Sequence, residues 1–353
     1  MSHTTTSLET QSDRLLDVLA DFEQVLVVMH DNPDPDAIAS GWALVCLIEE
    51  RLAKPTRLIG GGAIVRAENK HMVDLLGPPI QLVESIVVEE NTATILVDCS
   101  VGTSNQLVTR AGIEPIAVID HHVNGRDETR IAFKDVRHNA AASASITASY
   151  LQEQGIDPGV KLATAILYAI RTETCGSETY HSRLDRSVVK WVAQLADPEL
   201  LAEIQNAPLE PEYFGDLSLA MQGTFVYDDA AICLLPRAHG AEIVGEVADL
   251  LVRCRGIRRV LCAAIISDDI LISVRTEKGG ENAARLLQST LNGLGGCGGH
   301  EHRAGGKISE GAKDAKATEE LQETLRARWL KACKVDQSAG TRLVARREIV
   351  ENL

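Results

Sequence analysis

The chain has 353 residues, 45% of them hydrophobic, which is enough for two domains with separate cores. Its net charge of −15 and its 3% of aromatic residues argue against a protein that tracks long nucleic acid, which needs a basic surface and rings for base stacking. The eight cysteines form no Cys-x-x-Cys pair, and neither a signal-peptide pattern nor an apolar run of ~18 residues occurs, so we expect a cytoplasmic protein without a membrane partner.

Strands and helices are predicted to alternate over the first half of the chain, after an amphipathic helix near residues 8–23. The strands expected there are short apolar runs, at 24–29, 57–59, 94–98 and 115–120. The helices expected there have apolar residues at helical spacing, at 37–52, 72–76, 140–154 and 161–170. This βαβ rhythm predicts an α/β fold with a doubly wound, mostly parallel sheet.

A break in this rhythm predicts a second, smaller α/β domain. Its expected strands are 230–235, 260–266 and 270–274, and its expected helices are 243–252 and 282–291. We therefore predict four parts, with a cleft between the two domains: a metal-binding catalytic domain at 1–196, a helical linker at 197–222, a substrate-binding domain at 223–335 and a tail at 336–353.

Three of the apolar runs end in carboxylates and imidazoles. The side chains concerned are His30, Asp34, Asp36, Asp98, Asp120, His121 and His122. Taken alone, Asp36 could cap a helix that starts at Ala37, and a His-His pair is more often structural than a ligand. Together, carboxylates that converge at the carboxyl ends of parallel strands repel each other unless a cation neutralises them. Oxygen and imidazole donors without cysteine predict Mn²⁺ or Mg²⁺ rather than structural zinc.

The order His-x-x-x-Asp-x-Asp, a lone strand-end Asp and Asp-His-His resembles the DHH phosphoesterases. That family includes nanoRNases that also dephosphorylate pAp, cyclic-di-AMP and pApA phosphodiesterases, RecJ exonucleases and manganese-dependent inorganic pyrophosphatases. A second segment, Gly298-Gly299-His300-Glu301-His302-Arg303-Ala304-Gly305-Gly306, resembles the Gly-Gly-His and Ala-Gly-Gly loop of the DHH-associated C-terminal domain. The resemblance therefore spans about residues 20–310.

The resemblance implies two Mn²⁺ ions, with Mg²⁺ or another divalent cation as the alternative. His30, Asp34 and Asp98 would hold the first metal. Asp36, Asp98 and His121 would hold the second, so that Asp98 bridges the two.

Four further residues take their expected roles from the same resemblance. His122 would face the phosphate, and Asp120 would orient His121 from behind. Glu173 stands where the family typically has an Asp ligand of the second metal, so the chain departs from the pattern there. Arg275 matches an Arg that contacts phosphate, for which a planar guanidinium is suited.

The glycine-rich segment 295–306 is expected to be a loop whose backbone N–H groups cradle a phosphate. Its substrate-binding residues would be Gly299, His300, Arg303 and Gly305. Without the resemblance, a flexible surface turn is an equally good interpretation of this segment.

These features predict a manganese-dependent phosphodiesterase, or oligoribonuclease, in which two metals activate water. Its expected partners are short single-stranded RNA, dinucleotides such as pApA, or pAp as a 3′-phosphatase substrate, and no long duplex. RecJ is less expected because it usually carries additional domains. A manganese-dependent pyrophosphatase is an alternative, although the His300–Gly306 segment argues against it. A catalytically weak nucleotide-binding or regulatory protein is the rival from another class, and a homodimer remains open.

Overall fold

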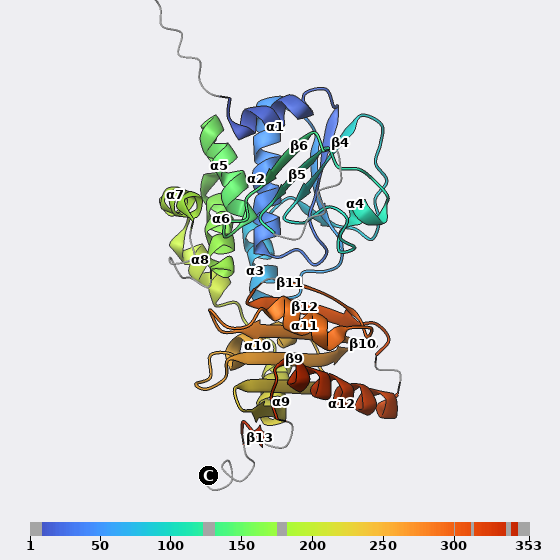
Figure 1. Cartoon of the computed structure of the whole chain (residues 1–353). Helices are drawn as coiled ribbons and strands as arrows, with labels where there is room; N and C mark the ends of the chain where they lie inside the picture. The colour runs from blue at the N-terminus through green and yellow to red at the C-terminus, as the bar shows by residue number, and fades with distance from the viewer. Residues whose placement is uncertain are drawn as a thin grey trace, which may run out of the picture. The chain divides into compact units, whose positions relative to one another are not determined.

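The computed structural model describes residues 9–122, 131–174, 182–299, 301–311, 314–336 and 340–344. The chain divides into two compact units, Met1–Pro208 and Leu209–Leu353, called here the N-terminal and C-terminal units (Figure 1). Among the described residues, no helix has both the length and the apolar character needed to cross a membrane.

The N-terminal unit is built on a six-stranded parallel sheet. Its strands are β1 (Gln24–Val28), β2 (Thr56–Gly60), β3 (Ile80–Leu82), β4 (Thr92–Val97), β5 (Ala117–Asp120) and β6 (Phe133–Val136). Their order across the sheet is β3-β2-β1-β4-β5-β6, and every neighbouring pair is parallel. This order confirms the predicted doubly wound α/β class, and it reverses direction between β1 and β4.

Eight helices accompany this sheet in the described part of the unit. They are α1 (Gln11–Leu19), α2 (Pro35–Leu52), α3 (Ala67–Leu76), α4 (Leu107–Arg110), α5 (Ser143–Gln154), α6 (Gly159–Glu173), α7 (Arg183–Val192) and α8 (Pro198–Gln205). Helix α2 packs against both α5 and α6, and the three run side by side in Figure 1.

The central strand β1 is buried on both faces of the sheet. Val25 and Val27 belong to the core under α2, α5 and α6, whereas Leu26 and Val28 belong to a second core that includes residues of α4. Such continuous apolar runs are typical of parallel strands covered on both sides. Because packing on both faces fixes β1, the residues that directly follow it are held in place.

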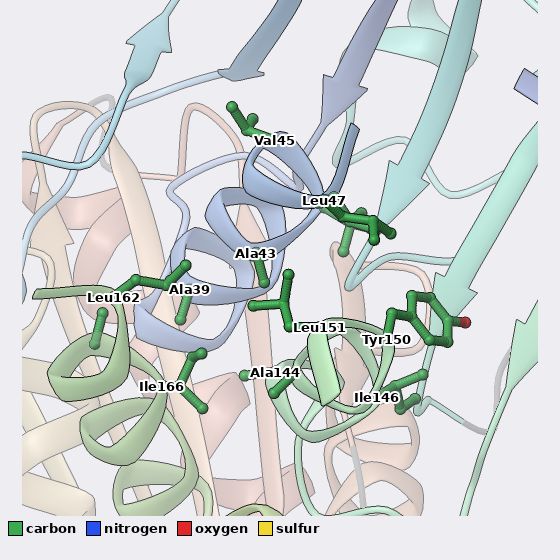
Figure 2. Packing of buried hydrophobic residues seen from close by; sticks show 14 of the residues in the cluster. Ala39, Ala43, Val45, Leu47, Ala144, Ile146, Tyr150, Leu151, Leu162 and Ile166 are labelled. Carbon is green, nitrogen blue, oxygen red and sulfur yellow. The ribbon is translucent and has the colours of Figure 1, made fainter. Parts of the chain in front are cut away.

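Small side chains let the helices of the first core approach closely. Ala39 and Ala43 lie one turn apart on α2 and face α5 and α6, where Ala144 and Leu151 of α5 and Ile166 of α6 meet them (Figure 2). Because alanine fills little space, the backbone of α2 comes near the N-terminal end of α5. This contact brings the first turn of α5 close to Asp36 in the first turn of α2.

The C-terminal unit contains a seven-stranded mixed sheet, ordered β11-β12-β10-β9-β8-β7-β13. Its strands are β7 (Thr224–Tyr227), β8 (Ala230–Arg237), β9 (Arg259–Ile266), β10 (Asp269–Thr276), β11 (Gly296–Gly299), β12 (Arg303–Ile308) and β13 (Thr341–Arg342). Its helices are α9 (Pro211–Gly223), α10 (Ile243–Leu251), α11 (Ala283–Leu291) and α12 (Ala315–Ala332). Within its described residues, β8 and β9 are the only parallel neighbours, and the unit has the α/β composition that the sequence predicts.

The division into units falls inside the segment 197–222 that the sequence predicts as a linker. Its two helices, α8 and α9, belong to different units: Leu201 and Ile204 lie in the N-terminal core, and Ala220 lies in a core of the C-terminal unit. Within the predicted tail, the two residues of β13 pair with β7.

The expected loop over 295–306 is wrong for most of its residues, because β11 and β12 form an antiparallel pair there. Gly299 has a φ of +148°, and an added Cβ would lie 2.4 Å from the Cα of Ala304. Only glycine fits both this backbone conformation and the close approach of the paired strand.

Candidate metal centre

The residues of the candidate centre follow β1 and β4, which are neighbours in the sheet. His30 lies just beyond β1, Asp98 just beyond β4, and Asp120 ends β5. Asp98 has a left-handed backbone with a φ of +56°, which turns the chain sharply at the strand end. Ligands of doubly wound proteins collect where the strand order reverses, and this is the position at which these side chains meet.

The N-terminus of α2 places two of the carboxylates. Asp34 is the N-cap, and its Oδ1 accepts hydrogen bonds from the backbone N–H groups of Asp36 (2.9 Å) and Ala37 (3.1 Å). The cap is therefore Asp34 rather than Asp36, because Pro35 occupies the first helical turn and starts the helix earlier than expected. Asp36 lies in that first turn and is 1% exposed.

A first group of possible ligands consists of His30, Asp34 and Asp98. The Nε2 of His30 lies 3.8 Å from Asp34 Oδ1 and 3.6 Å from Asp98 Oδ2, and one ligand atom from each residue lies within 4.8 Å of the others. Burial disfavours a charged His30, but the two carboxylates outweigh it and raise the pKa of His30 well above its usual value. Burial also opposes ionisation of Asp34, yet the imidazole of His30 lowers the pKa of Asp34 to about 2.

A second group surrounds the imidazole of His121. Its Nε2 lies 3.6 Å from Asp36 Oδ2 and 3.5 Å from Asp98 Oδ1. Asp98, His121 and His122 also offer ligand atoms within 4.8 Å of one another. Asp98 belongs to both groups and presents a different oxygen to each, Oδ2 to His30 and Oδ1 to His121.

The donor set fits a divalent cation. Burial raises the pKa of Asp36 well above its usual value, and the charges of Asp98, Glu173 and Asp34 raise it further. Carboxylates that destabilise each other's ionised form in this way are stabilised together by a cation between them. Oxygen and imidazole donors suit Mn²⁺ or Mg²⁺, and His30, Asp34, Asp36, Asp98 and His121 are the residues that would hold such ions.

Asp120 supports the ring of His122 rather than the ring of His121. Its Oδ1 lies 2.6 Å from His122 Nδ1 and accepts the backbone N–H groups of both histidines, while Ser100 donates to its Oδ2. The turn after β5 brings the ring of His122 next to the Asp120 carboxylate, whereas the sequence predicts His121 as its partner. The Nδ1 of His121 instead lies 3.3 Å from the carbonyl oxygen of Ala140.

The pKa values of this pair follow from their contact. Burial disfavours a charged His122, but its hydrogen bond to Asp120 and the nearby Asp98 raise the pKa of His122 to about 9. Burial opposes ionisation of Asp120 as well, but the bond to His122 lowers its pKa below the usual value. The imidazole of His122 therefore holds its proton more tightly than a free imidazole does, and its Nδ1 lies 3.8 Å from Asp98 Oδ1.

Glu173 is the last residue of α6 and is half-buried. Its charge contributes to the raised pKa of Asp36, so its carboxylate acts on the second group. Its role as a ligand of the second metal, in place of the Asp that the family pattern leads us to expect, stays a prediction.

The other predicted substrate-binding residues lie in the C-terminal unit. Arg275 of β10 and Arg303 of β12 are register partners, and Gly305 pairs with Ser273 in the same ladder. Arg275 donates to Asp249 Oδ1 (2.6 Å) and to Ser273 Oγ (2.6 Å), which holds its guanidinium in one orientation. His300 lies outside the described residues.

Sequence reasoning missed the residues that hold Asp36 and Asp98. The backbone N–H groups of Ser143 and Ala144 donate to Asp36, and the hydroxyl of Ser143 donates to Asp98 Oδ1. A Ser at the start of a predicted helix was the available signal, but the predicted start at residue 140 was three residues early.

This fold and this site define an α/β protein with a carboxylate–imidazole centre at the edge of its parallel sheet. Residues 24–170 match the family described as DHH family, N-terminal domain. Residues 24–170 of the N-terminal unit therefore carry a DHH family domain, which confirms the resemblance that the motifs suggest there.

Two curated proteins are similar to the chain in sequence. An uncharacterized protein from Methanocaldococcus jannaschii is 33% identical over 312 residues, which cover 87% of this chain and 63% of that protein. A probable manganese-dependent inorganic pyrophosphatase from Streptococcus pyogenes is 27% identical over 180 residues, which cover 50% of this chain and 57% of that protein. The chain thus spans about three fifths of the length of the curated relatives it matches.

Two solved structures share the fold. An exopolyphosphatase-related protein from Bacteroides fragilis superposes with a TM-score of 0.67 at 16% identity, over 93% of this chain and 99% of that chain. RecJ from Thermus thermophilus in complex with Mn²⁺ superposes with a TM-score of 0.51 at 15% identity, over 92% of this chain and 54% of that chain. At these identities the likeness extends to the architecture of both units and not to their substrates.

Proposed function

We propose that the chain is a phosphoric ester hydrolase that uses two divalent cations, Mn²⁺ by preference. The observation that carries this proposal is the position of Asp98, whose two carboxylate oxygens face two separate groups of ligand-type side chains. A shared carboxylate is the arrangement that holds two metal ions close together in phosphoryl-transfer centres. The DHH family domain and the manganese-dependent relative support the same assignment.

The two ions, when bound, would supply activation of water and neutralisation of the charge that develops on the phosphate. Asp98, His30 and Asp34 on one side and Asp36 and His121 on the other would fix their positions. The tight contact between Asp120 and the Nδ1 of His122 sets the tautomer and the orientation of that ring. We assign to the Nε2 of His122 a hydrogen bond to an oxygen of the phosphate.

We further propose short oligoribonucleotides, dinucleotides such as pApA, or pAp as substrates. The net charge of −15 is unfavourable for long strands, so binding should depend on a few local cations. Arg275 and Arg303 are neighbours in register in the C-terminal unit and are the proposed phosphate ligands there, together with Gly299, His300 and Gly305. Because Asp249 and Ser273 hold Arg275, little side-chain freedom would be lost on binding.

A panel of substrates tests this proposal, each assayed with Mn²⁺: pAp, pApA, cyclic-di-AMP, RNA of several lengths and pyrophosphate. We expect the shortest nucleotide substrates to be hydrolysed fastest and the rate to fall with RNA length. The pyrophosphatase relative makes pyrophosphate the second candidate substrate, and a preference for it would replace our first choice. Tight nucleotide binding without turnover of any compound would favour a regulatory protein.

Glu173 provides a separate prediction, because we propose that it is a ligand of the second metal. Glu173→Gln should weaken Mn²⁺ binding and lower kcat by roughly 10–100-fold, since the charge facing Asp36 is removed. Glu173→Asp should be tolerated better, because it keeps the charge and only makes the side chain shorter by one methylene group. Bound manganese per chain and kcat should be measured in parallel, with the exposed Glu50→Gln on α2 as the control. Wild-type affinity and rates in Glu173→Gln would remove Glu173 from the centre.

A further inference from the structure

The first turn of α5 holds two of the carboxylates of the candidate centre at once. The backbone N–H groups of Ser143 and Ala144 donate to Asp36 Oδ2 (2.8 Å) and Oδ1 (2.7 Å), and the Ser143 hydroxyl donates to Asp98 Oδ1 (2.8 Å). Asp36, Asp98 and Ser143 are all buried. These three hydrogen bonds join buried groups, and a buried polar group that loses its partner costs free energy, so they set the geometry of the two carboxylates.

Helix α5 lacks an ordinary cap. Its N-cap residue, Ala142, makes no side-chain capping bond, so the first N–H groups of the helix would be unsatisfied without an outside acceptor. The carboxylate of Asp36, more than 100 residues away in sequence, fills that role. The positive end of the helix also favours the negative charge that it meets there.

The Ser143 hydroxyl acts on the rotation of the Asp98 carboxylate. Asp98 presents Oδ1 to His121 and Oδ2 to His30, and Ser143 donates to Oδ1 alone. A carboxylate has about four lone-pair positions, so this bond leaves room for a cation at each oxygen. Without it, the carboxylate could rotate and both groups of ligands would lose their alignment.

We infer that Ser143 is a positioning residue that fixes Asp98 so that each of its oxygens serves one cation. The inference rests on the proposed function, and it adds a residue that touches neither cation nor substrate. It assigns to the first turn of α5 a role in metal affinity as well as in the stability of the fold.

Isothermal titration with Mn²⁺ tests this inference on Ser143→Ala, with Ser145→Ala as the matched control. Ser145 lies in the same turn of α5 and is buried, but its hydroxyl has no hydrogen-bond partner among the described residues. We expect Ser143→Ala to raise the Kd for Mn²⁺ about 10–100-fold and to lower kcat while the KM for substrate stays within about twofold. Ser145→Ala should keep wild-type Mn²⁺ affinity.

Two further measurements separate positioning from folding. In thermal unfolding of the metal-free proteins, Ser143→Ala should still unfold in one cooperative transition, with a Tm lowered only by the loss of one buried hydrogen bond. Ser143→Thr, which keeps the hydroxyl, should recover most of the Mn²⁺ affinity. Equal Mn²⁺ affinity in wild type and Ser143→Ala would overturn the role of Ser143 and leave the proposed function intact. A wild-type chain with no affinity for Mn²⁺ would overturn both.

Discussion

Asp98→Asn should abolish hydrolysis of every substrate and should sharply weaken the binding of both metal ions. The carboxylate lies 3.6 Å from His30 Nε2 and 3.5 Å from His121 Nε2, so both groups of ligands lose the same charge. The loss of activity should exceed the ~10–100-fold that follows from disturbing a residue behind a ligand. Rates on a nucleotide substrate and metal per chain provide the measurement.

Asparagine is the informative replacement here because of the backbone. Asp98 has a φ of +56°, a region that Asn tolerates well and Ala does not. Asp98→Asn therefore changes charge while preserving the turn, and Asp21→Asn at an exposed position is the control. A folded Asp98→Asn protein that retained substantial activity would rule out the bridging role of this residue.

His122→Ala should lower kcat by about 10²–10⁴-fold, the range typical of a lost proton donor or acceptor at a reacting group. We expect Mn²⁺ content to remain at the wild-type level, because the Nδ1 of His122 is committed to Asp120 at 2.6 Å. Kinetics with saturating Mn²⁺ and metal analysis of the same preparation provide the two readouts. His71→Ala, which alters a pair with Glu203 on α3 and α8, is the matched control.

A fall in metal content in His122→Ala would contradict the role assigned to His122. It would make His122 a ligand, in line with the compact group that it forms with Asp98 and His121. Another residue would then have to contact the phosphate.

The strands that carry the centre were predictable because their signals are strong. The runs before His30, Asp98 and Asp120 are continuous and apolar, and β1, β4 and β5 lie within three residues of their predicted bounds. Short edge strands such as β3 and β6 carry too few apolar residues to be recognised. Helix α12 was missed because it is largely charged and has few buried apolar side chains, among them Leu325 and Trp329.

The glycine-rich pair β11 and β12 was missed for a different reason. Glycine has low strand propensity, so the segment was interpreted as a loop, yet its backbone pairs with β10 through β12. Pairing partners are a tertiary property that no local pattern contains.

The acidic and imidazole side chains of the candidate centre were predictable from the sequence. The groups that donate hydrogen bonds to them were not. His30, Asp34, Asp36, Asp98 and His121 come together as the motifs suggest. The support from α5 comes largely from backbone N–H groups, which every residue type except proline possesses. The choice of His122 rather than His121 as the partner of Asp120 depends on the shape of a turn and not on residue type.

Titration of the metal-stripped chain with Mn²⁺ tests the central claim most directly. The protein would be treated with EDTA, dialysed and assayed for pApA hydrolysis as Mn²⁺ is added. The account predicts no hydrolysis without metal and a rate that reaches its plateau when two Mn²⁺ ions are bound per chain. Full hydrolysis in the presence of EDTA, or saturation with a single bound ion, would contradict it.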